Sequence, residues 1–290
     1  MAFDIPKPDP RRPRGKSLLA AARGKTQDRS EATYLRDYAP GDDYRQIDWT
    51  WCARRDEILT KVRPPHREES LFLLLDASRS MAAAEAKMEL VRRIAAILGA
   101  DALRHEQLVS AAAFSNRVQS LFPLRWGTAG IAPFMRFLTT LELRGDGTDL
   151  AAAADDLAQS TRRRGAVVLM SDLLDRHGFA EGIDRLRHHG FEPLVIQPIV
   201  AADADAPCLG EVELVDVETG RSQKVVVTEK AAAEYRRRVA AFYQSVREHC
   251  AKRRIVCLQP LHDAKAEDVV GELALAAASR PPRRNRGVSP

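Results

Sequence analysis

Five consecutive apolar residues, Leu71–Leu75, are followed at once by an aspartate, Asp76. A short unbroken apolar run of this kind is typical of a β-strand that is buried on both faces, as in a parallel sheet covered by helices. A second run, Ala166–Met170, has the same length and character and also ends in polar residues. The two runs therefore predict a largely parallel sheet with helices on both sides.

The segments around these runs alternate between strand and helix patterns. Further strands are expected at Leu108–Phe114, Val118–Phe122, Pro193–Val200 and Ile255–Gln259. Apolar residues at helical spacing predict helices over Glu85–Arg104, Gly130–Leu141, Asp149–Arg163, Gly178–His189, Glu229–Arg254 and Ala266–Ala278. A hairpin is expected from Glu211–Val217 and Gln223–Thr228. Such alternation indicates βαβ units, so we expect a Rossmann-like α/β fold elaborated by the hairpin and the long helix Glu229–Arg254, which we expect to pack on the core.

Charge is distributed unevenly along the 290 residues. Residues 1–30 carry eight Lys and Arg against three Asp, and residues 279–290 carry four Arg and no acid, so the part between them has a net charge of −4 although the whole chain has +5. Pro- and Arg-rich segments with few apolar residues are typical of disordered tails. We expect basic tails at 1–28 and 279–290, and an α/β domain at 68–278 on which a segment at 29–67 packs.

Composition favours a cytoplasmic globular protein. Apolar residues make up 45% of the chain, yet no stretch approaches the roughly 20 apolar residues that cross a bilayer, and the N-terminus has no signal-peptide run. The basic tails leave weak, salt-sensitive nucleic-acid or membrane binding as an alternative. The four cysteines show no disulfide or Cys-x-x-Cys spacing, and a zinc site from Cys250, Cys257, His249 and His262 matches no common finger, so we expect reduced thiols.

The most informative motif is Asp76-Ala-Ser78-Arg-Ser80, directly after the first apolar strand. Ligands of parallel α/β sheets collect at the carboxyl ends of the strands, near the switch in strand order. One carboxylate and two hydroxyls at alternate positions suit a hard cation, Mg²⁺ in preference and Mn²⁺ as an alternative. Taken alone, the motif is weak because short polar residues are common in turns.

Two later residues make the motif specific. Thr148 lies in a Gly-containing loop at the start of a helix, and Asp172 directly follows the strand Ala166–Ser171. Both are expected at the same edge of the sheet as Asp76. With Ser78 and Ser80 they complete a set that resembles the metal-ion-dependent adhesion site of von Willebrand factor A domains. The resemblance implies that all five residues ligate the metal, directly or through water.

A wider resemblance covers roughly residues 29–275. The matching segments are similar to a bacterial family known as domain of unknown function fifty-eight. They are Arg36–Trp49, Ala53-Arg54-Arg55, Leu71–Met81, Ser171–Asp175 and Leu214–Gly220. Many relatives carry two membrane helices ahead of this region, which this chain lacks, and the resemblance therefore implies a soluble version.

The resemblance implies a non-enzymatic interaction module of the bacterial cytosol. A partner protein would donate a Glu or Asp carboxylate to the bound metal, and a MoxR-type AAA+ ATPase is the expected partner in the assembly of other proteins. A second contact surface is a candidate at a segment rich in charged and aromatic residues: Asp42, Asp43, Arg45, Asp48 and Trp49. The alternative is that Trp49 and Trp51 only anchor this segment on the sheet domain.

A metal-dependent phosphoester hydrolase is the competing hypothesis. Hydrolysis requires a base or nucleophile beside the ion, for which His177 and Asp175 are the candidates. A haloacid-dehalogenase-like phosphatase also begins with an aspartate at a strand end. That family normally has a second aspartate two residues later, where this chain has Ser78. This difference argues against a phosphatase of that family.

Overall fold

The computed structural model describes residues 17, 34–37, 52, 59–62, 70–83, 85–142, 147–200, 209–215 and 222–279. The chain divides into two units, one of Met1–Ala22 with Glu69–Arg280 and one of Arg23–Glu68 with Pro281–Pro290. In the second unit, strands β1 (Tyr34–Asp37) and β2 (Leu59–Val62) form an antiparallel pair.

Several sequence predictions fall on parts of the chain outside the described residues. The candidate contact residues Asp42, Asp43, Arg45, Asp48 and Trp49 all lie there, as does the tail at 280–290. Their roles therefore stay predictions. Within the segment expected as the N-terminal tail, Ser17 is described: it is buried and donates a hydrogen bond to Gln107 Oε1 at 2.6 Å.

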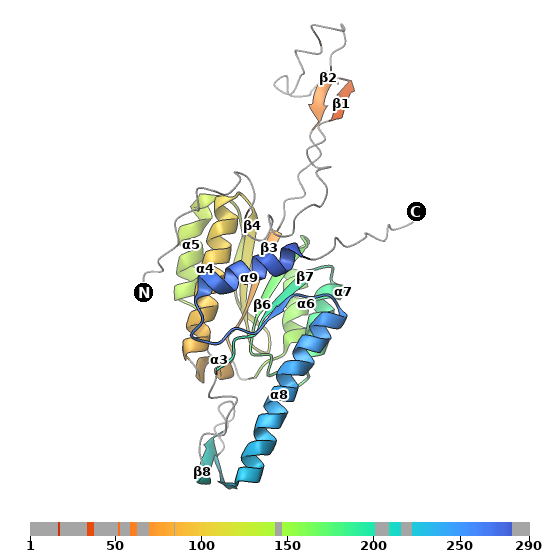
Figure 1. Ribbon diagram of the computed structural model, residues 1–290. Helices are drawn as coiled ribbons and strands as arrows, with labels where there is room; N and C mark the ends of the chain where they lie inside the picture. The colour runs from red at the N-terminus through yellow and green to blue at the C-terminus, as the bar shows by residue number, and fades with distance from the viewer. Residues whose placement is uncertain are drawn as a thin grey trace. The chain divides into compact units, whose positions relative to one another are not determined.

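A six-stranded sheet forms the centre of the larger unit (Figure 1). Its strands are β3 (Ser70–Asp76), β4 (Leu108–Phe114), β5 (Val118–Arg125), β6 (Gly165–Met170), β7 (Glu192–Ile196) and β10 (Cys257–Leu258). The order is β10-β7-β6-β3-β4-β5, and all neighbours are parallel except β4 and β5. When these six strands are numbered from one to six in chain order, they lie in the order 6-5-4-1-2-3, which is that of a doubly wound sheet. The direction of the strand order reverses between β3 and β6. The predicted α/β sheet, mostly parallel and flanked by helices, is confirmed.

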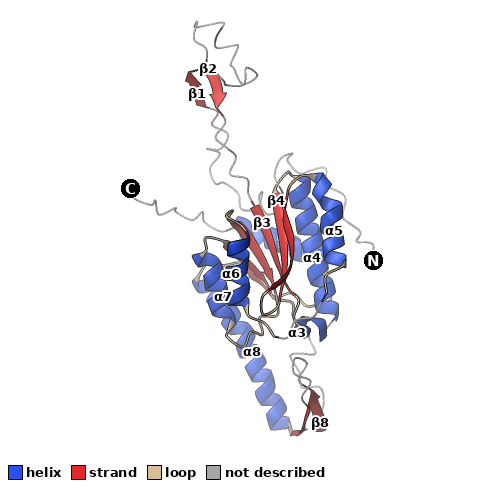
Figure 2. Ribbon diagram, turned by 180° about the vertical axis from the view of Figure 1, so that it is seen from behind, coloured by secondary structure: helices blue, strands red, loops and turns tan. Residues whose placement is uncertain are grey.

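Helices cover both faces of this sheet (Figure 2). One face carries α4 (Glu85–Arg104), α5 (Ile131–Thr139) and α9 (Ala266–Ala278), and the other carries α6 (Leu150–Ser160), α7 (Phe179–His188) and α8 (Glu229–Lys252). The one-turn elements α3 (Arg79–Ala83) and η2 (Thr128–Gly130) precede α4 and α5. Strand β3 supplies Leu71, Leu73 and Leu75 to one core and Phe72 and Leu74 to the other. Because successive strand side chains point to opposite faces, an unbroken apolar run is what a strand between two helical layers requires.

Strand boundaries differ from the prediction in β7, which ends at Ile196 instead of Val200, and at the two edges of the sheet. The edge strand β5 continues to Arg125 instead of ending at Phe122, and only Phe122 of its residues is fully buried. An edge strand has one solvent-exposed side, where polar residues and Pro123 are tolerated. Because these residues interrupt the apolar pattern, the sequence does not indicate the full length of the strand. At the opposite edge, β10 is only two residues long, shorter than the expected Ile255–Gln259.

The predicted hairpin and long helix are both present. Strands β8 (Gly210–Val215) and β9 (Ser222–Val227) pair antiparallel, and Thr228 then caps α8 by accepting a hydrogen bond from Ala231 N at 3.2 Å. The expectation that α8 packs on the core holds for its C-terminal half, where Val246 and Cys250 join the apolar cluster. The N-terminal half projects away from the sheet (Figure 1), and Tyr235 there is 44% exposed. None of the described helices is long and apolar enough to cross a membrane.

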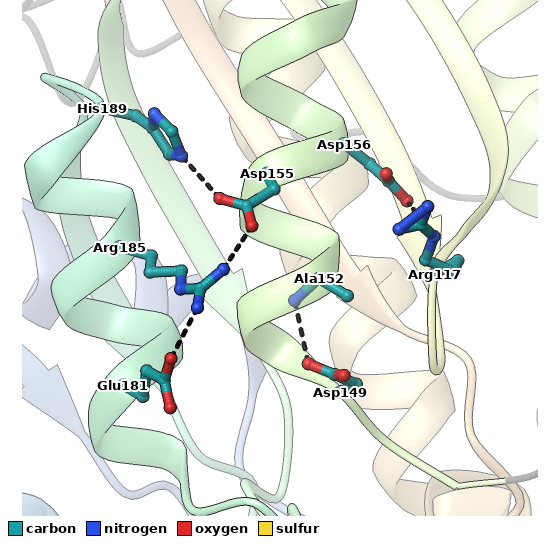
Figure 3. Close-up of polar contacts among 8 residues, drawn as sticks. All are labelled: Arg117, Asp149, Ala152, Asp155, Asp156, Glu181, Arg185 and His189. Atoms are coloured by element: carbon teal, nitrogen blue, oxygen red, sulfur yellow. Dashed lines mark hydrogen bonds and ion pairs between the residues drawn. The ribbon is translucent and has the colours of Figure 1, made fainter.

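A polar network ties α6 to α7 (Figure 3). The Asp155 carboxylate is contacted by Arg185, and by His189 Nε2 at 2.7 Å. Asp149 caps α6 by accepting a hydrogen bond from Ala152 N at 2.8 Å. Such a capping interaction stabilises a helix start by about 1 kcal/mol. The cap therefore stabilises the first turn of α6, which begins two residues after Thr148.

Candidate metal centre

Asp76 is the last residue of β3 and is fully buried. Its Oδ1 atom accepts a hydrogen bond from the backbone N–H of Ser78 at 2.9 Å, and its Oδ2 atom accepts one from the Ser171 hydroxyl at 2.5 Å. The first bond is the local aspartate turn that bends the chain out of the strand. The second bond joins the end of β3 to the end of β6.

The two serines of the motif lie beside each other in the turn that follows. Ser78 Oγ and Ser80 Oγ are 2.9 Å apart, with Ser78 buried and Ser80 partly exposed. Helix α3 begins between them at Arg79, and the hydrogen bond from Ala77 N to Phe114 O at 2.7 Å holds the turn against the end of β4. The loop thus presents two hydroxyl oxygens next to the buried carboxylate of Asp76.

Thr148 is placed at the same edge by its neighbours in the chain. The next residue, Asp149, donates its backbone N–H to Ser115 O at 3.0 Å, just beyond the end of β4. Leu150 N donates to Asp175 Oδ2 at 2.8 Å, in the loop after β6. The buried Thr148 Oγ1 has no hydrogen-bond partner among the described residues. An unsatisfied buried hydroxyl costs about 1–3 kcal/mol, which a ligand at this position would recover.

Asp172 follows β6 and is buried like Asp76. Its backbone carbonyl accepts a hydrogen bond from the buried Gln197 side chain at 2.8 Å. Its Oδ1 atom accepts a longer one from Leu174 N at 3.2 Å. Lys87, in the first turn of α4, approaches the other carboxylate oxygen to 3.8 Å. Side chains from α4 and from just after β7 therefore position this one aspartate together with its own loop.

The two aspartates influence each other directly. Burial, and then the negative charge of Asp172, raises the pKa of Asp76 from 3.8 to about 7, while the hydrogen bonds from Ser171 and Ser78 act in the opposite direction. Two buried carboxylates that repel each other are a site that a cation stabilises. Two carboxylates with three hydroxyls form an all-oxygen donor set, which fits Mg²⁺ or Mn²⁺ and lacks the thiolate and imidazole ligands usual for zinc.

The structure thus places all five predicted residues at the carboxyl edge of the sheet, at the switch point between β3 and β6. They are Asp76, Ser78, Ser80, Thr148 and Asp172. Their ligation of a metal stays a prediction. Within the described ranges, no three His, Cys, Asp or Glu side chains are grouped to hold a metal, which leaves the zinc alternative without support. Cys250 and Cys257 are free thiols, as expected.

Sequence analysis missed three residues that support the centre: Ser171, Lys87 and Gln197. A signal for Lys87 was present, because it stands four residues before Val91 on the apolar side of the α4 pattern, where a charged residue requires a buried partner. Gln197 is fully buried and bonds to Gln259 at 2.7 Å as well as to Asp172. Its role depends on strand pairing between β6 and β7, which no local pattern reveals.

A family model described as Protein of unknown function DUF58 matches residues 34–249. The uncharacterized protein Rv1480 of Mycobacterium tuberculosis is 29% identical over 225 residues, which cover 73% of this chain and 68% of the relative. The uncharacterized protein YeaD of Bacillus subtilis is 29% identical over 151 residues, which cover 50% of this chain and 35% of the relative.

Solved structures also resemble the chain. An aerotolerance-related membrane protein of Bacteroides fragilis is similar with a TM-score of 0.49 and 16% identity, covering 73% of this chain and all of that one. Proximal thread matrix protein 1 from the mussel byssus, in a form with a zinc-occupied MIDAS motif, is similar with a TM-score of 0.36 and 13% identity. That match covers 45% of this chain and 38% of that one.

Proposed function

The chain belongs to the family described as Protein of unknown function DUF58, and we propose that this member is a non-enzymatic interaction module that binds a protein partner through a divalent metal ion. Mg²⁺ is the preferred ion and Mn²⁺ the alternative. The observation that carries the proposal is the buried hydroxyl of Thr148, which has no hydrogen-bond partner among the described residues and lies at the sheet edge where two buried aspartates repel each other. A hard cation there would satisfy the hydroxyl and neutralise the repulsion.

Each residue of the centre has a definite task in this proposal. Ser78, Ser80 and Thr148 offer neutral oxygens, and Asp76 and Asp172 offer negative charge directly or through water. When bound, the ion supplies an electrophilic position for one further oxygen ligand. Because only two of the five ligands are anionic, that position favours a carboxylate from a partner's Glu or Asp side chain.

The partner is proposed to be a MoxR-type AAA+ ATPase, with which this module would assist the assembly of other proteins. The support for this partner is the family resemblance, since genes of the family commonly accompany such ATPases. The fold and the site are compatible with many partners.

The proposal that the chain is not an enzyme rests on the neighbours of the centre. Asp175, a candidate base, has both carboxylate oxygens engaged by backbone N–H groups, from Leu150 at 2.8 Å and from His177 at 2.7 Å. The side chain of His177, the other candidate, is exposed to solvent. These bonds give Asp175 a structural role, because they fasten the loop after β6 to the start of α6.

A capture experiment tests the proposal. The immobilised full-length chain is presented with a MoxR-type ATPase from the same organism in Mg²⁺ and in EDTA. Capture is expected in Mg²⁺ and is expected to be lost in EDTA or with Asp76→Ala. The matched control Asp268→Ala removes an exposed aspartate on α9 and should capture normally. Equal capture under all conditions, or none in Mg²⁺, would overturn the proposal in its present form.

The hydrolase alternative has its own test. The purified chain is incubated with p-nitrophenyl phosphate and bis-p-nitrophenyl phosphate in Mg²⁺ or Mn²⁺. No turnover is expected. Turnover that disappears in Asp172→Asn would support a metal-dependent hydrolase instead.

A further inference from the structure

A positively charged side chain is already buried beside the candidate metal centre. The ammonium group of Lys87 lies 3.8 Å from Asp172 Oδ2, and the two side chains are each only 5% exposed. Buried lysines are rare because the charge loses its hydration, and they persist where an opposite charge compensates. Lys87 and Asp172 come from α4 and from the loop after β6, so tertiary structure alone brings them together.

The local structure opposes a lysine at this position. Lys87 is the third residue of α4, whose first turn otherwise carries the acidic Glu85. The positive end of the helix dipole disfavours a cation in the first turn. Lys87 also occupies the buried side of the helix together with Val91 and Ile94. The helix dipole and the burial both disfavour a lysine here, so its presence is explained by the neighbouring candidate metal centre and not by the stability of the helix.

The charges of the centre show what that requirement is. Asp76 and Asp172 supply two negative charges when both are ionised, and Lys87 supplies one positive charge. A divalent ion therefore brings the centre to a net charge of +1, whereas without Lys87 it would reach zero. A carboxylate from a partner then restores neutrality.

From this geometry we infer that Lys87 is a resident cation of the centre, which weakens metal binding and makes the metal-loaded centre more attractive to a carboxylate. This inference rests on the proposed function. Without metal, Lys87 compensates the charge of Asp172. With metal, the two cations share that aspartate, and their repulsion is relieved when an acidic side chain of the partner binds.

The test measures metal affinity, not partner capture. Mn²⁺ is titrated into the full chain and into Lys87→Met, and free Mn²⁺ is followed by electron paramagnetic resonance. We expect Lys87→Met to bind Mn²⁺ at least about tenfold more tightly, since a unit positive charge is removed from beside a divalent ion in a partly buried site. The matched control is Lys230→Met, which removes an exposed lysine from the first turn of α8 and should leave the affinity unchanged.

Two further readouts separate this role from simple packing. In EDTA, Lys87→Met should melt at a lower temperature than the wild type, because Asp172 loses its buried partner. A residue with only a structural role would lower stability and metal affinity together, whereas here they move in opposite directions. Acetate titrated into the Mn²⁺-saturated chain, followed by water proton relaxation, should bind at least about threefold more weakly to Lys87→Met.

The outcomes are distinguishable. If the wild type binds no Mn²⁺, both the proposed function and this inference fail. If it binds Mn²⁺ but Lys87→Met binds equally or more weakly, only the inference fails. If Lys87→Met does not fold, Lys87→Gln and Lys87→Arg replace it. Gln should tighten Mn²⁺ binding, and Arg, which keeps the charge, should not; the same affinity for both overturns the inference.

Discussion

The Ser171 hydroxyl donates a hydrogen bond to Asp76 Oδ2, so the ends of two neighbouring parallel strands are joined side chain to side chain. The same hydroxyl accepts the backbone N–H of Leu173 at 2.9 Å and so shapes the turn that carries Asp172. Leu173 adopts a left-handed backbone conformation with φ of 62° and is nevertheless buried. The candidate metal centre is therefore held by a turn that a leucine adopts only under tertiary constraint.

The raised pKa of Asp76 predicts an unusual pH dependence for the metal-free chain. The folded state keeps the proton up to a pH of about 7, whereas the unfolded state releases it near 3.8. Stability should therefore fall as the pH rises from about 4 to about 7, by on the order of 4 kcal/mol at most. Urea unfolding in EDTA across this range measures it, and Asp76→Asn should remove this fall. A wild-type chain whose stability changes with pH as that of Asp76→Asn does would contradict the prediction.

Thr148→Val should separate metal binding from stability. Valine has nearly the same shape, and Thr148 Oγ1 has no hydrogen bond to lose among the described residues. We expect the metal-free unfolding free energy to stay the same or to rise by about 1 kcal/mol, while the stabilisation by Mg²⁺ becomes much smaller. Thermal unfolding with and without Mg²⁺ measures both. Thr148→Ser, which keeps the hydroxyl, is the control and should respond to Mg²⁺ as the wild type does.

Asp175→Asn tests whether the start of α6 must be fastened to the loop after β6. The asparagine amide can accept one backbone N–H but not both of those from Leu150 and His177, so we expect a loss of about 1–2 kcal/mol in the unfolding free energy. Mg²⁺ affinity should also fall, because Thr148 and Asp172 flank this bond. Unfolding curves and Mn²⁺ titration check the two effects. A change in stability with unchanged metal affinity would show that the bond does not position the centre.

Asp155→Asn should weaken the contact between α6 and α7. The hydrogen bond from His189, and then that from Arg185, holds the pKa of Asp155 below its usual 3.8. The stabilisation is therefore present above that pH and is lost as the pH falls through the lowered pKa. We expect about 1 kcal/mol of destabilisation at pH 6 that disappears near pH 2, measured by urea unfolding. Glu234→Gln, at an exposed ion pair on α8, should change nothing measurable.

Local sequence patterns predicted the parts of the fold that bury apolar surface on a regular period. The runs in β3 and β6 could be identified because helices cover them on both faces, and the positions of Asp76 and Asp172 at their ends followed from parallel pairing. The length of β5 could not be predicted, because an edge strand tolerates polar residues. The apolar residues Tyr235 and Phe242 predicted α8 correctly but not that half of it leaves the core.

The candidate metal centre, like the fold, could be predicted from the sequence only where local patterns determine it. Asp76, Ser78, Ser80, Thr148 and Asp172 follow from strand ends and a helix start, which sequence patterns reveal. Lys87, Ser171 and Gln197 act across elements, and their partners are known only once the sheet is assembled. Their contribution is a matter of geometry and charge in three dimensions, which no single segment encodes.

The strand order has a consequence for how the module would respond to unfolding. Asp76 and Ser171 are 95 residues apart along the chain but touch at the switch point. An ion held there would act as a reversible crosslink between the first and second halves of the sheet, and the unfolded chain would have no comparable affinity for it. A partner that needs the metal would therefore bind only chains in which both halves of the sheet have assembled. Incompletely folded chains would not enter the complex.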